Sequence, residues 1–328
     1  MHAQKISIIV TVRNEILSID AFMGSVFAQE ELPDELVIVD AMSTDGTWER
    51  LHAYQERCEK IGIHYVIHQV DGNRSVGRNR AIELARNELI CATDVGCILD
   101  SYWNKNLVQP ARTARLTPEV RKGWYLPLAT TPFQHALATY TCVMPDKLDP
   151  ATFLPSSRSI AFTKSIWKAV GGYPEELDTC EDLVFAQRLE EYCRAHELDS
   201  VFAPDAIVYW PQKSTISQAF WQFFGYARGD GQAIRYVFAL RWRVVFIYVR
   251  YLLAVMLLAS YFQTANPLFL HVFIGGSIAY LIWATWKNYR YVAGWRARVY
   301  LPVLQIVSDV AVMAGFACGL LQSTFSKK

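Results

Sequence analysis

The first hundred residues alternate between two hydrophobic patterns. Short, β-branched apolar runs that end at polar residues are typical of buried strands, and segments with apolar residues at helical spacing separate these runs. Strands are predicted over residues 6–12, 36–40, 63–68 and 89–93, and helices over residues 16–27 and 75–87. Strands that alternate with helices form parallel sheets with right-handed crossovers. The pattern therefore predicts an α/β fold with a mostly parallel sheet and flanking helices.

Acidic residues mark the carboxyl ends of two predicted strands. Asp40 ends the second strand and Asp94 follows the fourth. Ligands of parallel sheets bind beyond the carboxyl ends of the strands, so the two carboxylates are expected to face one crevice. Two more polar segments, residues 77–80 and 181–182, are expected at the same edge. No Gly-x-Gly-x-x-Gly pattern follows the first strand, which disfavours a dinucleotide-binding fold.

Charge is distributed unevenly along the 328 residues. From Ala233 onward the chain has 10 Lys and Arg residues and one acidic residue, Asp309, whereas the preceding part has 22 basic and 30 acidic residues. Residues 251–286 contain no Lys, Arg, Asp or Glu and are longer than the roughly 20 residues that one membrane span requires. The chain is therefore expected to divide into an α/β domain over residues 1–232 and a basic, apolar membrane segment over residues 233–328.

Two or three helices of the membrane segment are expected to contact the bilayer. Residues 244–262 and 267–285 are the predicted spans, and residues 301–321 form either a third span or an interfacial helix. A third span would carry Lys327 and Lys328 to the outer side, which favours the interfacial alternative. Basic residues near the spans should face the cytoplasm, so the protein is expected at the inner, cytoplasmic membrane. These residues are Arg235, Arg241, Arg243, Lys287, Arg290, Arg296 and Arg298.

Asp309 is the single acidic residue of the membrane segment, and a carboxylate is expensive in lipid unless a cation pairs with it. We therefore predict an ion pair between Asp309 and Arg250. Ala311, Gly315 and Gly319 recur at every fourth residue, a spacing that lets helices approach closely. The aromatic segment 220–231 predicts either a helix at the level of the lipid headgroups or a buried core helix.

Seven cysteines are scattered through the chain, and their odd number and apolar surroundings favour free thiols in a reducing compartment. Cys91 and Cys97 flank Asp94 but lack a second pair at zinc-binding spacing. Residues 6–12 are too short for the apolar core of a secretory signal. These features favour an intracellular protein without disulfides.

Five short motifs occur in the order in which a known enzyme family carries them. They are residues 7–15, SIIVTVRNE; 39–47, VDAMSTDGT; 77–79, GRN; 93–97, TDVGC; and 171–182, which begins with GGYPE and ends with CED. This combination resembles the family 2 glycosyltransferases of the GT-A fold, a Rossmann-like α/β fold. The resemblance covers residues 6–182 and includes a Thr-Asp-x-Gly-Cys variant of the family's Asp-x-Asp motif.

The resemblance implies a donor site made of Thr11, Arg13, Glu15, Asp40, Arg78 and Asp94. In it, Asp40 would accept a hydrogen bond from the donor base, and Arg78 would meet the phosphates. Asp182 would be the catalytic base that takes a proton from the acceptor hydroxyl, with Glu181 as a supporting neighbour. One base and no second nucleophile imply inversion. The residues alone leave alternatives open: Asp40 capping a turn, Arg78 on a solvated helix surface, and residues 181–182 as partners of a helix dipole.

Asp94 matches the first acidic residue of the Asp-x-Asp motif, which implies a divalent cation, Mg²⁺ or Mn²⁺, held against the donor diphosphate. The second acidic position is Gly96 in this chain. One carboxylate can still hold Mg²⁺ when phosphate oxygens and waters supply the remaining ligands. Residues 208–210 lack the His that some relatives carry at a similar place, so that ligand is not expected here.

The resemblance and the membrane segment together predict an inverting glycosyltransferase. Its expected donor is a UDP-, GDP- or dTDP-sugar, and its expected acceptor is lipid-linked or a saccharide, as in the synthesis of surface polysaccharide or glycolipid. Tethering enzyme and acceptor to one membrane raises their effective concentration. Transfer to polyprenyl phosphate is the alternative within the class, and a non-catalytic membrane assembly or binding module is the alternative outside it. Membrane lipids are expected partners and nucleic acid is not.

Overall fold

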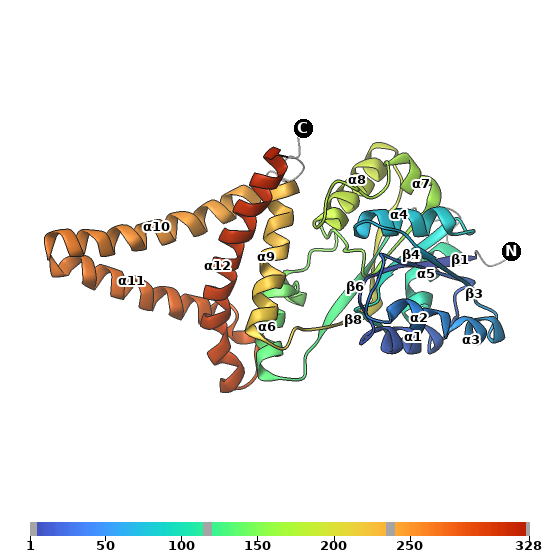
Figure 1. The fold of residues 1–328 in the computed structure, drawn as a ribbon, viewed down its shortest axis with the longest axis horizontal. Coiled ribbons are helices and arrows are strands. Elements are labelled where there is room, and N and C mark those ends of the chain that lie inside the picture. The colour runs from blue at the N-terminus through green and yellow to red at the C-terminus, as the bar shows by residue number, and fades with distance from the viewer. Residues whose placement is uncertain (1–4, 114–119, 234–239, 326–328) are drawn as a thin grey trace. The chain divides into compact units, whose positions relative to one another are not determined.

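The computed structural model describes residues 5–113, 120–233 and 240–325. They form two compact units, which we describe separately. The sheet unit is built from the chain up to Leu128 and from Leu148–Pro211, and the helical unit from Ala129–Lys147 and the chain after Pro211 (Figure 1). The helical unit thus takes one short segment from within the α/β part of the chain.

One eight-stranded sheet forms the centre of the sheet unit, in the order β3-β2-β1-β4-β7-β6-β8-β5 (Figure 1). Its strands are β1 Ile6–Val12, β2 Glu35–Asp40, β3 His64–Gln69, β4 Leu89–Asp94, β5 Ile98–Leu99, β6 Val120–Leu128, β7 Ile160–Thr163 and β8 Ser200–Pro211. The helices of this unit are α1 Ile19–Phe27, α2 Thr47–His52, α3 Gln55–Lys60, α4 Arg74–Leu84, α5 Trp103–Thr113, α7 Lys164–Ala169 and α8 Glu181–Ala195. β3, β2, β1 and β4 run parallel, whereas β7 is antiparallel to β4 and β6. The predicted α/β fold is confirmed.

Apolar clusters cover both faces of the parallel strands. Ile8 of β1 belongs to a cluster with Phe22 of α1, and the next residue, Ile9, belongs to a second cluster with Ile82 of α4 and Phe185 of α8. Figure 1 shows α1, α2 and α3 on one side of the sheet and α4, α7 and α8 on the other. Burial on both faces explains why these strands are continuous apolar runs rather than alternating ones.

The strand register brings the two predicted acidic strand ends to one edge of the sheet. Val12 of β1 pairs with Asp40 of β2, and Thr11 of β1 pairs with Asp94 of β4. The predicted strands agree with the observed ones to within one or two residues. The helix predicted over 75–87 ends earlier, because Ala85 adopts an extended backbone conformation.

Helices make up the second unit. They are α6 Pro132–Thr141, α9 Ile216–Gln232, α10 Leu240–Thr264, α11 Pro267–Trp286 and α12 Trp295–Phe325, with short 3₁₀ turns at Pro145–Lys147 and Tyr289–Tyr291. α6, α9 and α12 share one apolar cluster, and α10 and α11 form a hairpin that extends away from α12 (Figure 1). Three helices are long and apolar enough to cross a membrane, over Trp242–Thr264, Pro267–Tyr291 and Trp295–Ser323. They are therefore able to anchor the protein in a membrane, as the hydropathy predicts.

Two predictions for the membrane segment are confirmed by contacts. Arg250 Nη2 of α10 donates to Asp309 Oδ2 of α12 at 2.9 Å, which is the expected ion pair. A Cβ added at Gly315 or Gly319 would lie 2.3 or 2.0 Å from a backbone carbonyl oxygen of α9. The small residues of α12 therefore permit its close approach to α9.

The cysteines, several basic residues and the domain boundary also bear on predictions from the sequence. No disulfide joins any of the seven cysteines, all of which lie in the described residues, and five of them are buried. Arg235, Lys327 and Lys328, which bear on the predicted membrane orientation, lie outside the described residues. The boundary predicted at residue 232, between a catalytic domain and a membrane segment, stays a prediction. The two compact units of the structure meet at other points of the chain, after Leu128, Lys147 and Pro211.

Candidate functional site

Asp94 lies where β4 reaches the carboxyl edge of the sheet. β4 is paired on both sides, with β1 and β7, and its residues up to Thr93 are buried. The side chain of Asp94 is 30% exposed, so it emerges from an edge whose backbone is fixed. Strand pairing therefore delivers one carboxylate in a defined position.

The N-terminal end of α4 is held close to this edge. Asn73 caps the helix, because its side-chain oxygen accepts a hydrogen bond from the backbone N–H of Val76 at 3.1 Å. A Cβ added at Gly77 would lie 2.2 Å from Thr11 Oγ1 of β1, so glycine is required for this approach. The next residue, Arg78, is thereby brought against the end of the sheet.

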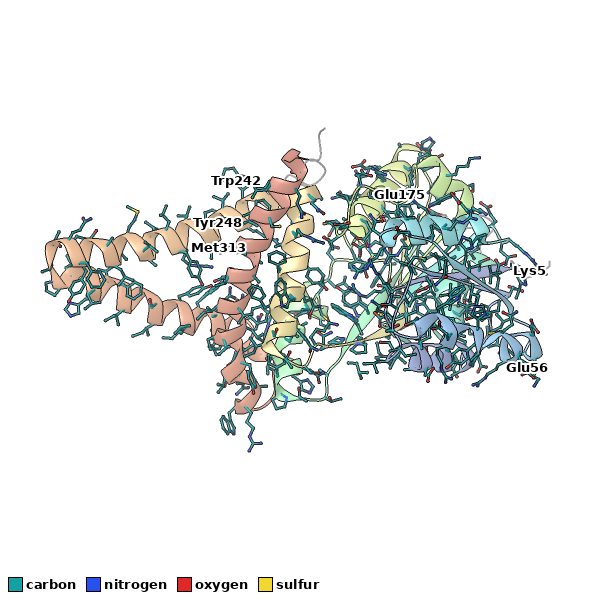
Figure 2. The ribbon with its side chains drawn as sticks, in the orientation of Figure 1. Lys5, Glu56, Glu175, Trp242, Tyr248 and Met313 are labelled. Carbon is teal, nitrogen blue, oxygen red and sulfur yellow. The ribbon has the colours of Figure 1, made fainter. Side chains whose placement is uncertain are left out.

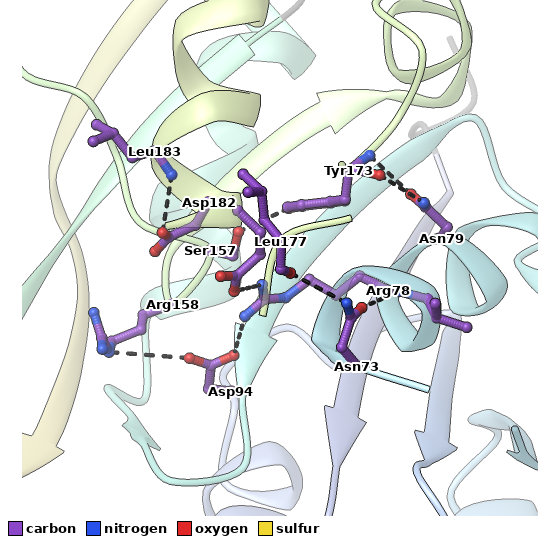
Figure 3. Close-up of polar contacts among 12 residues, drawn as sticks. Asn73, Arg78, Asn79, Asp94, Ser157, Arg158, Tyr173, Leu177, Asp182 and Leu183 are labelled. Atoms are coloured by element: carbon purple, nitrogen blue, oxygen red, sulfur yellow. Dashed lines mark hydrogen bonds and ion pairs between the residues drawn. The ribbon is translucent and has the colours of Figure 1, made fainter. Parts of the chain in front are cut away.

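Arg78 bridges two carboxylates from distant parts of the chain (Figure 3). Its Nη2 donates to Asp94 Oδ1 at 2.8 Å, and its Nη1 donates to Glu181 Oε1 at 2.7 Å. The guanidinium also lies 5.3 Å from the ring centroid of Tyr173. Arg78 is 2% exposed, which excludes the alternative of a solvated helix surface. We refer to Arg78, Asp94 and Glu181 as the charged cluster.

Burial and charge act against each other in the charged cluster. Burial alone would lower the pKa of Arg78, but Asp94 and Glu181 raise it overall, so the guanidinium stays charged. Burial would raise the pKa of Asp94, but the nearby arginines, first of all Arg78, lower it. For Glu181 burial is the larger effect, and its pKa is raised although Arg78 opposes the shift. The charged cluster therefore favours the ionised form of Asp94, whereas burial favours the neutral form of Glu181.

Glu181 and Asp182 are the first two residues of α8. Cys180 precedes them with a φ of 70°, a left-handed conformation that is uncommon for a residue with a side chain. Glu181 points inward and is buried, whereas Asp182 is partly exposed. Asp182 Oδ1 accepts a hydrogen bond from the backbone N–H of Leu183 at 2.9 Å (Figure 3). Of these two carboxylates, Asp182 is the one that a substrate can reach.

Two asparagines, Asn73 at the N-cap of α4 and Asn79 within α4, fix the loop that leads to α8. Asn79 accepts a hydrogen bond from Tyr173 N and donates one to Tyr173 O, both at 2.9 Å. Asn73 donates to the carbonyl oxygen of Glu175 at 2.7 Å and to that of Leu177 at 3.2 Å, and Figure 3 shows the second of these bonds. These bonds join segments that are 94 to 104 residues apart in the sequence. They fix the start of α8 relative to α4, and so keep Glu181 within reach of Arg78.

Arg158 lies at the other oxygen of Asp94. Its Nε is 4.0 Å from Asp94 Oδ2, and its guanidinium lies 4.0 Å from the ring centroid of Trp210 and 5.7 Å from that of Tyr125. In the sequence, Arg158 stands among the hydroxyls of residues 156–159, a pattern that is equally typical of a phosphate or sugar contact and of a polar turn. Only the fold brings this arginine to Asp94.

Asp40 is fully buried at the end of β2, where local groups donate to its carboxylate. The backbone and hydroxyl of Ser43 both donate to it, and Gln69 Nε2 donates to Oδ2 at 2.8 Å. The turn-capping alternative is thus present in this structure. A contact between Asp40 and a donor base stays a prediction.

The remaining predicted donor residues follow the end of β1. Thr11 lies against α4 at Gly77, Arg13 is exposed just beyond the strand, and Glu15 Oε2 accepts a hydrogen bond from the hydroxyl of Ser18 at 2.7 Å. All three share the carboxyl edge with Asp94. Their contact with a donor likewise stays a prediction.

Ligands for a cation are few at this edge. Within the described ranges, no three His, Cys, Asp or Glu side chains gather as a metal site. Nothing lies within 4 Å of a Cβ added at Gly96, so this position offers space but no ligand. Burial raises the pKa of the Cys97 thiol, which disfavours a thiolate ligand. A hard cation held by Asp94, with phosphate oxygens and water as the other ligands, therefore stays a prediction.

The N-terminal part of the sheet unit matches a known family. Residues 7–117 match the family described as Glycosyl transferase family 2. Residues 7–117, about a third of the chain, thus carry the sequence pattern of a family 2 glycosyltransferase. The match includes Asp40, Arg78 and Asp94 and ends before Asp182, so it does not extend to the start of α8. No curated protein sequence matches this glycosyltransferase.

Solved structures resemble the glycosyltransferase over its full length. The mannosyltransferase PcManGT from Pyrobaculum calidifontis, in complex with GDP-Man and Mn²⁺, aligns over 100% of this chain and 89% of its own, with 15% identity and a TM-score of 0.55. S. aureus TarS aligns over 96% of this chain and 55% of its own, with 15% identity and a TM-score of 0.49. TarS 1–349 in complex with UDP reaches 0.46 at 15% identity, over 96% of this chain and 90% of its own. The likeness to PcManGT confirms the GT-A fold, and the lower scores of TarS add nothing to it.

Proposed function

We propose that this glycosyltransferase transfers a sugar, with inversion, from a UDP-, GDP- or dTDP-sugar to a lipid-linked acceptor at the cytoplasmic face of a membrane. The charged cluster carries this proposal. Arg78 holds Asp94 and Glu181 at the carboxyl edge of the sheet, and Asp182 stays accessible beside them. Such a transfer needs positive charge for the departing diphosphate and a base for the attacking hydroxyl, and both kinds of group lie at this edge.

Asp182 is the proposed catalytic base. It takes the proton from the acceptor hydroxyl, and the acceptor oxygen attacks the anomeric carbon opposite the leaving diphosphate. Glu181 is a poor candidate for this step, because its carboxylate is buried and bound to Arg78. Its proposed role is to position Arg78. One base without a second nucleophile gives a single displacement, and therefore inversion.

Arginines supply the positive charge for the donor diphosphate in this proposal. Arg78 donates to Asp94 Oδ1 and Arg158 Nε lies 4.0 Å from Oδ2, so both are near any phosphate bound beside this carboxylate. Arg74 adds positive charge that also favours the ionised form of Asp94. Guanidinium groups suit this task because they can donate two parallel hydrogen bonds to phosphate oxygens. The nucleoside end of the donor site is assigned to Asp40, with Thr11, Arg13 and Glu15 beside it.

We assign a divalent cation, Mg²⁺ or Mn²⁺, to Asp94. When bound, such a cation neutralises charge on the departing diphosphate. Asp94 must be ionised to hold it, and the arginines around Asp94 favour the ionised form. The presence of Mn²⁺ with GDP-Man in the PcManGT complex supports this assignment.

Residues 1–232 are assigned to catalysis and residues 233–328 to attachment at the inner, cytoplasmic membrane. The apolar helices support this division, and the basic residues near them support a cytoplasmic catalytic domain. A lipid-linked acceptor fits an anchored enzyme, because confinement to one surface raises the effective concentration of the two partners.

Asp182→Asn tests the proposed base. Turnover should fall by about 10²–10⁴-fold, the usual contribution of a general base, while donor binding is retained. Glu191→Gln, on an exposed position of the same helix, is the matched control and should change neither quantity. Transfer of radiolabelled sugar into a membrane lipid extract measures turnover, and calorimetry with the nucleotide diphosphates measures binding. Full turnover in Asp182→Asn would remove Asp182 from the role of base.

Thermal stabilisation by donors tests the cation and the nucleotide. The detergent-purified protein is heated with UDP-, GDP- and dTDP-sugars, with and without Mg²⁺ or Mn²⁺, and Asp94→Asn is measured in parallel. One donor should raise the unfolding temperature in a metal-dependent manner, and Asp94→Asn should abolish the metal dependence. A donor effect that is independent of metal in both proteins would refute the cation assignment. Unchanged turnover after substitution of Asp40, Asp94 and Asp182 together would favour a non-catalytic binding module.

A further inference from the structure

The α10–α11 hairpin contacts α12 near the middle of that helix. Tyr248 of α10 donates to Met313 O at 2.6 Å (Figure 2), and Arg250 of α10 pairs with Asp309. From α11, Tyr280 donates to the same carboxylate of Asp309. These contacts lie near the centre of the 31 residues of α12. α12 therefore extends beyond the hairpin in both directions.

The hairpin has the dimensions and the surface of a membrane insertion. At 1.5 Å per residue, α10 is about 37 Å long and α11 about 30 Å, so both match a hydrocarbon core of roughly 30 Å. In the most apolar windows of α10 and α11 only 6% of the residues are buried within the protein, against 39% for α12. The side chains of the hairpin thus need lipid around them, whereas much of α12 is already covered.

α9 covers α12 along its second half. A Cβ at Gly319 would lie 2.0 Å from Arg228 O, and Gln232 Nε2 donates to Gln322 Oε1 at 2.8 Å. α9 also carries Gln222 and Asp230, so it is a poor helix for the interior of a bilayer. If α12 crossed the bilayer, α9 would have to bring these polar and charged side chains into hydrocarbon or separate from α12.

α6 covers the first turns of α12. Tyr140 of α6 donates to Leu301 O at 2.7 Å, and the ring of Phe133 lies 5.4 Å from that of Tyr300. The 10 residues of α6 measure about 15 Å, half of a bilayer core. The chain also belongs to the sheet unit on both sides of this segment. α6 is therefore unable to follow α12 into the bilayer.

The uncovered side of α12 is apolar. Buried residues such as Leu301 and Leu304 lie in the cluster shared with α6 and α9, and Asp309 lies toward the hairpin. The exposed apolar positions recur at intervals of three or four residues, which makes them one continuous face. They are Trp295, Val299, Val303, Ile306 and Val310.

We propose that only the α10–α11 hairpin crosses the bilayer, and that α12 lies along the bilayer surface with its exposed apolar face in the acyl boundary. α9 lies beside it, with the exposed rings of Trp221 and Tyr226 at the headgroup level. The partner of this surface is lipid. The described part of the chain then has two spans, and both ends of α12 remain on the same side of the membrane as the sheet unit. This topology is independent of the transferase reaction.

Labelling of introduced cysteines tests the number of crossings. Ala265→Cys lies in the hairpin turn, Ala293→Cys precedes α12, Ser323→Cys lies at its end, and Glu56→Cys on the sheet unit is the orientation reference (Figure 2). Sealed vesicles of known orientation are treated with a membrane-impermeant maleimide of high mass. The unsubstituted chain already has seven cysteines, so each variant is scored by the labels that it gains relative to that chain. Positions 56, 293 and 323 should react from one side and position 265 from the other. Reaction of position 323 from the side of 265, or of 265 from the side of 56, overturns the proposal.

Depth measurements along α12 provide a second test that requires no topology assignment. Nitroxide labels at Val299→Cys, Val303→Cys and Val310→Cys are placed in lipid vesicles, and their depth is obtained from their relative accessibility to oxygen and to a polar nickel chelate. A helix lying on the surface gives three similar, shallow depths. A spanning helix would separate positions 299 and 310 by up to about 16 Å, which would overturn the proposal.

Discussion

Asp309→Asn is the substitution whose effect the structure defines best. Asp309 is 1% exposed, and its Oδ2 accepts hydrogen bonds from Arg250 at 2.9 Å, from Tyr251 at 3.2 Å and from Tyr280. Gln305 Nε2 donates to the other oxygen at 2.8 Å. Asparagine preserves the shape of this side chain but removes the charge that Arg250 requires. The variant therefore isolates the electrostatic contribution of one carboxylate that joins three helices.

The expected loss is about 2–3 kcal/mol of unfolding free energy. Breaking a fully buried ion pair by removing one partner costs about 3–5 kcal/mol, because the other charge is left uncompensated. The side chain of Arg250 is 34% exposed, so polar surroundings replace part of the lost interaction. The expected loss is therefore smaller than for a fully buried pair, about 2–3 kcal/mol. A loss of this size corresponds to roughly a 30- to 140-fold change in the unfolding equilibrium constant.

Unfolding in detergent measures this loss. Mixed-micelle titration with a denaturing detergent, followed by intrinsic fluorescence, compares the variant with Asp146→Asn. Asp146 also pairs with an arginine of the helical unit, but both side chains are exposed, 44% for Asp146 and 67% for Arg290, so this control should lose less than about 1 kcal/mol. If Asp309→Asn lost no more stability than Asp146→Asn, the buried pair would not hold the hairpin on α12.

Further outcomes follow from the sheet unit. Arg78→Met should lose more stability at pH 8 than at pH 5 in thermal scans. Burial raises the pKa of Glu181, so the fold is favoured while Glu181 is protonated and is disfavoured as the pH rises. Arg78 opposes this rise of the pKa, and its removal therefore makes the loss at high pH larger. An equal loss at both pH values would contradict this reasoning. Gly77→Ala should destabilise the protein by about 1–3 kcal/mol and weaken donor binding in calorimetry, because a Cβ there meets Thr11 Oγ1 at 2.2 Å; unchanged binding and stability would mean that α4 moves freely. Gly96→Asp has open space around its Cβ and should strengthen Mn²⁺ binding, whereas Gly24→Asp, also in open space but on α1, should not; equal effects of both would indicate non-specific attraction.

Local patterns were sufficient to predict the strands and their acidic ends. Asp94 follows a buried apolar run, and a carboxylate at such a position has to lie at the edge of the sheet whatever the rest of the fold is. The pairing of Asp309 with Arg250 was predictable for a similar reason, because a low dielectric leaves a carboxylate few alternatives. In both cases a short segment and one physical rule determine the outcome.

Local sequence patterns do not predict the contacts of Arg78 and Arg158. Arg78 meets Glu181, which is 103 residues away, only because the asparagine contacts of α4 position the start of α8. Arg158 reaches Asp94 from the segment before β7, an antiparallel strand that the alternating pattern did not predict. Hydropathy also could not distinguish the environment of α12 from that of α10, because composition records how apolar a helix is and not what covers it.

The discontinuous origin of the helical unit has a consequence for synthesis. The chain enters this unit with α6 at Pro132–Thr141, returns to the sheet unit at Leu148 and leaves it again after Pro211. Leu301 of α12, which contacts Tyr140, follows the end of α6 by 160 residues, so at 5–20 residues per second it emerges from the ribosome about 8–32 s later. During this interval the apolar side of α6 has no permanent partner from α12. The nascent chain therefore presents a hydrophobic segment to its surroundings for many seconds before the helix that finally covers it has been made.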